Sequence, residues 1–126
     1  MDLSTPEAAV RSFTKAIISG NAESVMTCLL PGGTDYQDIQ DILNAGPDDP
    51  QQKSKYQMRL WLQSLDPDAE MPITDTRHTE YGMEIYWQVT FKKDATMEGH
   101  TFRAGDTFVL DARLRRSGDN WLIDGM

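Results

Sequence analysis

The sequence contains a single cysteine, no long apolar run and few basic residues, and each shortage excludes a class of protein. With Cys28 alone among 126 residues, the chain can form neither an internal disulfide nor a thiolate metal cluster. No apolar run approaches the ~20 residues of a membrane-spanning helix. The 12 Lys and Arg residues against 20 Asp and Glu give a net charge of −8, which predicts no nucleic-acid partner.

Other signals are missing as well. The first residues lack the basic start, apolar stretch and cleavage site of a secretory leader. This predicts a cytoplasmic protein as the sequence stands, or an extracytoplasmic one if a leader was removed before Met1. We expect no metal, because no His pair has ligand spacing, and no cofactor. The length and the composition, 39% hydrophobic and 25% charged, predict one domain over residues 1–126.

The first half of the chain has the pattern of helices. Thr5 or Ser4 is placed to cap a first helix, with proline in the first turn, and Gly20 is placed to end it. Apolar residues recur along this segment at intervals of three and four. The same spacing predicts a short second helix and two longer ones, over about residues 35–43 and 50–65.

The second half of the chain changes to a period of two. Residues 83–92 and 107–115 alternate apolar and polar side chains, which predicts two half-buried strands. Weaker strands are expected over residues 73–81, 100–103 and 121–124. Because only the helices are available to cover the apolar face of this sheet, the predicted fold class is α+β, with N-terminal helices packed on a strongly curved antiparallel sheet.

Both ends of the chain carry motifs of a known family. The start, TPEAAVRSF at residues 5–13 followed by the Gly20-Asn21 turn, and the end, GDNWLIDG at residues 118–125, resemble the nuclear transport factor 2-like superfamily, in particular its small bacterial domains of unassigned role. The resemblance implies a cystatin-like, cone-shaped α+β roll with an open or a filled cone. Members include binding adaptors and isomerase- or polyketide-cyclase-like enzymes, so the fold does not fix the function.

The inward positions of the two clear strands give the main functional argument. None of them is titratable, whereas an isomerase-like enzyme needs a carboxylate base in the apolar cone. We therefore expect a non-catalytic domain that binds a small apolar ligand in the cone or a protein partner on the sheet face. No catalytic residue is predicted, and the predicted ligand-binding residues are Phe13, Tyr56, Trp61, Trp87, Phe91, Phe108 and Leu110.

The outer sheet face is the second candidate surface. It is expected to present aromatic, polar and charged side chains, among them Tyr86, Gln88, Asp111 and Arg113. Asp111 and Arg113 offer the self-complementary charges that a two-fold contact needs, and homodimers through this face are implied by the resemblance. A simply solvated face is the alternative.

An enzymatic alternative stays open. An isomerase- or cyclase-like enzyme would take its acid or base from the helices, the weak strand or the connecting loop, where the candidates are Tyr36, Tyr56, Asp75, His78 and His100. The carboxyl of Asp124, next to Gly125 at the end of the last strand, is instead interpreted as part of a closing structural motif.

Overall fold

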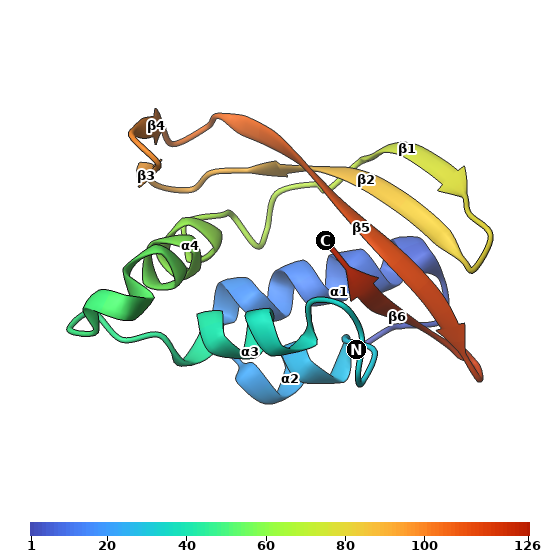
Figure 1. Cartoon of the computed structure of the whole chain (residues 1–126). Helices are drawn as coiled ribbons and strands as arrows, with labels where there is room; N and C mark the ends of the chain where they lie inside the picture. Colours follow the sequence, from blue (N-terminus) through green and yellow to red (C-terminus); the bar gives the residue numbers. More distant parts are fainter.

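The computed structural model describes residues 1–126 as a layer of helices beside a layer of strands (Figure 1). The helices come first: α1 (Pro6–Ser19), α2 (Ala22–Thr27), α3 (Tyr36–Asn44), the 3-10 turn η1 (Pro50–Gln52) and α4 (Lys53–Gln63). The strands follow: β1 (Ile73–His78), β2 (Met83–Thr90), β3 (Ala95–Met97), β4 (His100–Phe102), β5 (Thr107–Ser117) and β6 (Asn120–Gly125). The predicted α+β class, with the helices N-terminal to the strands, is confirmed.

The ends of the first two helices follow from local side chains. Thr5, rather than Ser4, caps α1, and its Oγ1 accepts a hydrogen bond from the backbone N of Ala8 at 3.1 Å. Gly20 ends α1 with a φ of 74°, a left-handed conformation that costs glycine little. The side chain of Asn21 then caps α2 by accepting from the backbone N of Ser24 at 3.1 Å. The chain therefore reverses between α1 and α2 through a stop signal and a start signal in adjacent residues.

The main sheet has four antiparallel strands in the order β1-β2-β5-β6, and β3 and β4 form a separate hairpin. β2 pairs with β5 from Thr107 to Leu114, but β6 pairs only with residues 113–117 of β5. The first half of β5 therefore has a neighbouring strand on one edge only. The sheet is not strongly curled, which differs from the strongly curved sheet predicted from the sequence. It is too narrow to wrap around the helices, and the hairpin and α4 close one end of the molecule instead (Figure 1).

The core lies between α1 and the inner face of the sheet. Ile85, Trp87 and Leu114 are buried there in one cluster with Val10 and Phe13 of α1. The one polar group that Trp87 brings into this core is satisfied. Its Nε1 donates to Oγ1 of Thr14 at 3.0 Å, and Thr14 Oγ1 donates to the carbonyl of Val10 at 2.7 Å. Burial therefore leaves no unpaired donor on Trp87, which stabilises the packed arrangement.

The segment 28–35 closes the other edge of β6. The backbone N of Leu30 donates to the Ile123 carbonyl at 2.8 Å, and the Ile123 N donates to the Cys28 carbonyl at 2.9 Å. Burial in this region raises the pKa of the Cys28 thiol to about 11, so the thiol is neutral near neutral pH. None of the helices combines the length and apolarity that crossing a membrane requires.

Asp124 fastens this segment to the sheet. Its Oδ2 accepts from Nε of Arg115 at 3.1 Å, and its Oδ1 accepts from the backbone N of Thr34 at 3.4 Å. Gly33 fits against this carboxylate because a Cβ there would lie 2.9 Å from Oδ1. These contacts place the carboxylate in a structural junction between β5, β6 and the loop before α3.

Candidate functional site

An apolar cavity of about 720 Å³ lies where the first half of β5 runs beyond β6. Helices α1, α3 and α4 contribute to its lining, as do the β3–β4 hairpin and β5. Of its 18 lining residues, 13 are hydrophobic: Phe13, Ile17, Ile39, Ile42, Met58, Trp61, Leu62, Met97, Phe102, Phe108, Val109, Leu110 and Met126. Cavities of this size and character are typical sites for small molecules.

Consecutive residues of β5 contribute to the lining, which shows how the cavity meets the strand. Phe108 and Leu110 share one side of β5, and Val109 and Asp111 share the other, yet all of them line the cavity. The cavity therefore reaches the free edge of β5 as well as its inner face. This explains why Phe108 is 39% exposed although its side chain is on the apolar side of the strand.

Aromatic rings form one wall of the cavity. Trp61 of α4 meets Phe102 of β4 and Phe108 of β5 edge to face, with ring centroids 5.5 and 5.1 Å apart. Phe91 lies behind them, with its ring centroid 4.9 Å from that of Phe102. Such pairs stabilise the wall beyond the area they bury, by about 0.5–1.5 kcal/mol each. They fix the hairpin and α4 to the start of β5.

Trp61 also brings an unpaired donor to this wall. The side chain is only 3% exposed, and its Nε1 has no hydrogen-bond partner. The indole of Trp87, in contrast, donates to Thr14. A buried N–H without an acceptor is unfavourable by about 1–3 kcal/mol, so the indole of Trp61 is held less favourably than that of Trp87.

The remaining five lining residues are four acids and one histidine. Asp35, Asp38, Glu98 and Asp111 make up what we call the acidic lining, and His100 is the fifth residue. No Lys or Arg lines the cavity. The polar part of the site therefore carries a single sign of charge.

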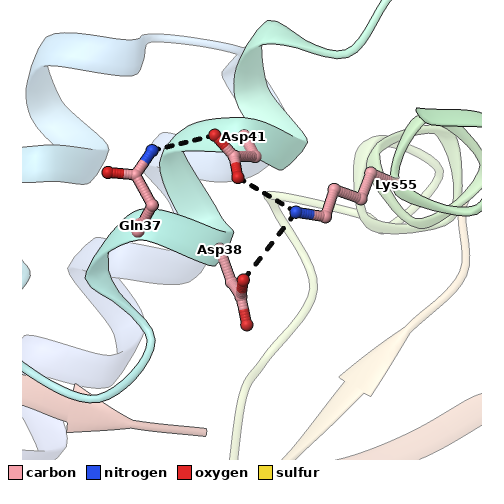
Figure 2. A network of polar contacts seen from close by, with 4 residues as sticks. All are labelled: Gln37, Asp38, Asp41 and Lys55. Carbon is pink, nitrogen blue, oxygen red and sulfur yellow. Dashed lines mark hydrogen bonds and ion pairs between the residues drawn. The ribbon is translucent and has the colours of Figure 1, made fainter. Parts of the chain in front are cut away.

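A cluster of polar contacts joins the two helices that flank the cavity (Figure 2). Nζ of Lys55 on α4 lies 3.0 Å from Oδ2 of Asp41 and 3.7 Å from Oδ1 of Asp38, both on α3. Gln37 donates to Oδ1 of Asp41 at 2.9 Å. The Gln37 hydrogen bond, followed by Lys55, holds the pKa of Asp41 below its ordinary value, and Asp41 raises the pKa of Lys55. The cluster links α3 to α4 beside the cavity.

The structure divides the seven predicted ligand-binding residues into two groups. Phe13, Trp61, Phe108 and Leu110 line the cavity. The remaining three, Tyr56, Trp87 and Phe91, do not: Trp87 and Phe91 are buried in the core, and Tyr56 stacks beneath the guanidinium of Arg59, with 5.1 Å from Cζ to the ring centroid.

Sequence reasoning missed the contributions of α3 and the β3–β4 hairpin. Ile39 and Ile42 line the cavity from α3, and Met97 and Phe102 line it from the hairpin. The spacing of Ile39 and Ile42 signals an apolar helix face, but not which cavity that face meets. The hairpin gave a weaker signal, the short strand expected at residues 100–103.

The candidates for acid–base chemistry are scattered. Of the five, only His100 lines the cavity, and its ring lies edge-on to that of Phe102 at 4.6 Å. Asp75 is exposed and pairs with Arg77 at 3.0 Å, and His78 is exposed at the end of β1. No group of three or more His, Cys, Asp or Glu side chains is arranged to hold a metal ion.

Side chains on the outer face of the sheet contact one another. The guanidinium of Arg77 lies over the ring of Tyr86, 5.0 Å from its centroid, and the Tyr86 hydroxyl hydrogen-bonds to Glu84. That hydrogen bond raises the pKa of Tyr86. Asp111, opposite Tyr86 in the register, has no ion-pair partner in the chain.

No protein-family model, no curated protein and no solved structure matches this chain.

Proposed function

We propose that this chain is a non-catalytic domain that binds a small apolar molecule in the cavity beside the first half of β5. The observation behind this proposal is the cavity itself, about 720 Å³ with 13 hydrophobic residues among 18. Several of these hydrophobic side chains, among them Phe108 and Val109, are exposed to solvent in the free protein. A ligand in the cavity would remove this apolar surface from water.

The size of the effect can be estimated from the surface that a ligand would bury. A chain of about ten carbons hides roughly 200 Å² of apolar area, which is worth about 5 kcal/mol at ~25 cal/mol per Å². Preformed walls reduce the ordering cost that opposes this gain, because the Trp61, Phe102 and Phe108 rings already contact one another. We therefore expect a simple apolar probe to bind with a dissociation constant of roughly 0.2 mM or weaker.

The resemblance to the nuclear transport factor 2-like superfamily is part of the same proposal. It is supported by the order of the elements and by the two end motifs. The sheet is not strongly curled, so the cone that the family fold implies would here be formed by the helices, the hairpin and the sheet together. An isomerase- or cyclase-like enzyme is the second candidate, because carboxylates and His100 line the same apolar cavity; it has less support because no hydrogen bond or ion pair joins His100 to any of these carboxylates.

The proposal is tested by titrating the protein with decanol and following the heat of binding and the tryptophan emission. We expect saturable binding, with a change in emission because Trp61 lines the cavity. Ile42→Trp narrows the cavity and should abolish binding. Ile18→Trp, on a half-buried α1 residue outside the lining, is the matched control and should leave binding intact. Absence of saturable binding to the wild type, or equal binding by both folded variants, would overturn the proposal.

A further inference from the structure

Some acidic residues of the cavity have partners within the chain, and others have none. Oδ2 of Asp35 accepts from the backbone N of Met126 at 2.7 Å, and Asp38 lies near Lys55. Glu98 and Asp111 make no hydrogen bond or ion pair through their side chains. The two come from different elements, the β3–β4 turn and β5. The acidic lining thus includes two carboxylates whose charge is not balanced by a neighbouring base.

These charges border an otherwise apolar space, and this combination restricts what can bind. An anionic head group would meet the unpaired carboxylates of Glu98 and Asp111, and no Lys or Arg of the lining offsets that repulsion. A cationic head group would be attracted by the same carboxylates. The net charge of −8 adds attraction at longer range.

Aromatic rings line the same space. The faces of Trp and Phe rings attract cations when the cation lies within about 6 Å of the ring centroid. Trp61, Phe102 and Phe108 all line the cavity that also contains Glu98 and Asp111. Apolar, aromatic and acidic groups therefore converge on one binding space.

We propose that the ligand of this cavity is an amphipathic cation, with an apolar body among the hydrophobic residues and an amine-type cationic group beside Glu98 or Asp111. This inference rests on the proposed function and adds the charge class of the ligand. It predicts discrimination among molecules that share one apolar chain and differ only in the head group.

The test compares decylammonium, decanol and decanoate by calorimetry at neutral pH, low salt and concentrations below micelle formation. We expect decylammonium to bind roughly tenfold more tightly than decanol, and decanoate to bind at least tenfold more weakly than decanol. Added salt should reduce both differences, because screening weakens interactions between exposed charges. Decanol binding should change little with salt.

A pair of double variants locates the charge effect. Glu98→Gln with Asp111→Asn should bring decylammonium affinity down to about that of decanol while leaving decanol affinity unchanged. Glu23→Gln with Asp119→Asn changes the net charge equally, at α2 and at the β5–β6 turn outside the lining, and should retain most of the preference.

The outcomes separate this inference from the proposed function. If all probes bind with equal affinity, the charge class is wrong and the apolar-ligand proposal stands. If the control double variant loses the preference as completely as the lining variant, net charge rather than the cavity selects the ligand, and the inference is overturned. If no probe binds, the proposed function itself fails.

Discussion

The two halves of β5 carry the same alternation of residues but occupy different surroundings. In the second half, Leu114 is only 1% exposed, and β5 pairs there with β2 on one edge and with β6 on the other. In the first half, Phe108 is 39% exposed, and the strand has β2 on one edge and the cavity at the other. One half of the strand closes the core, and the other half borders an open apolar space.

The difference shows that the length of β6 determines where one edge of β5 is left without a neighbouring strand. β6 pairs with the second half of β5, and the segment 28–35 and α1 both pack against β6. On the edge of β5 opposite β2, no strand continues beyond Arg113. Phe108 still contacts Trp61 and Phe102 there, but a cavity is left between this half of β5, α3, α4 and the hairpin. The same pattern of apolar residues thus serves stability in one half and, in our proposal, binding in the other.

The largest expected effect contrasts two leucines on the same side of β5. Leu114→Ala creates a void in the closed core and should lower the free energy of unfolding by about 2–5 kcal/mol. Leu110→Ala enlarges an existing cavity beside a half-buried side chain and should cost only about 1 kcal/mol. Urea unfolding of both variants measures the difference. Equal losses would show that the two halves are packed alike.

The next effect concerns the close approach of backbone at the closed end. A Cβ on Gly82 would lie 1.9 Å from the carbonyl oxygen of Leu114, so Gly82→Ala forces the β1–β2 turn away from β5 and should cost about 1–3 kcal/mol. Gly46→Ala is the control, since a Cβ there meets nothing within 4 Å. Thermal unfolding should separate the variants clearly. A Gly82→Ala protein as stable as the control would contradict the packing described for the second half of β5.

A smaller contrast compares two aspartates in the two halves of the structure. Asp124, whose side chain is 15% exposed, bonds to Arg115 and to the Thr34 backbone, so Asp124→Asn should cost about 1 kcal/mol. Asp111 has no such partner, and Asp111→Asn should leave the free energy of unfolding nearly unchanged. Denaturant titration of the pair provides the measurement. A destabilisation by Asp111→Asn as large as that by Asp124→Asn would show that Asp111 has a structural role.

The smallest expected effect is the pH dependence of the cluster that joins α3 to α4. Because the pKa of Asp41 is lower in the folded protein than its ordinary value of 3.8, this carboxylate stabilises the fold above that value. Its contribution is lost as the pH falls through the lowered folded pKa. Lys55→Met should remove part of this dependence, so the wild type should lose slightly more stability than the variant on acidification. Parallel stability curves for the two proteins would argue against the Lys55 contribution.

The sequence was sufficient to predict the helices and strands and to tell which face of each clear strand is buried, because both follow from local periodicity. Thr5, Gly20 and Asn21 specify the helix ends through their own backbone hydrogen bonds or conformation. The alternation in β2 and β5 correctly separates buried from solvent-facing positions at Ile85 and Leu114.

The location of the cavity could not be predicted in the same way, because it depends on how far β6 extends along β5 and on how the hairpin meets α4. Trp87 and Trp61 are both buried aromatic residues, and no pattern in the sequence states that Thr14 satisfies the first indole while the second lacks an acceptor. Strand parity also fails at a free edge, where Val109 and Leu110 line the same cavity. Such positions follow from the meeting of distant segments.

The most direct test of ligand binding beside the first half of β5 is a set of amide and indole NMR spectra recorded during a titration with decylammonium. Our account predicts that the indole N–H of Trp61 and the amides of residues 108–111 shift together and saturate at one dissociation constant. The indole N–H of Trp87 and the amides of residues 113–117 should stay in place. Shifts spread evenly along β5, or shifts confined to residues outside the cavity, would contradict the assignment of this half of the strand to ligand binding.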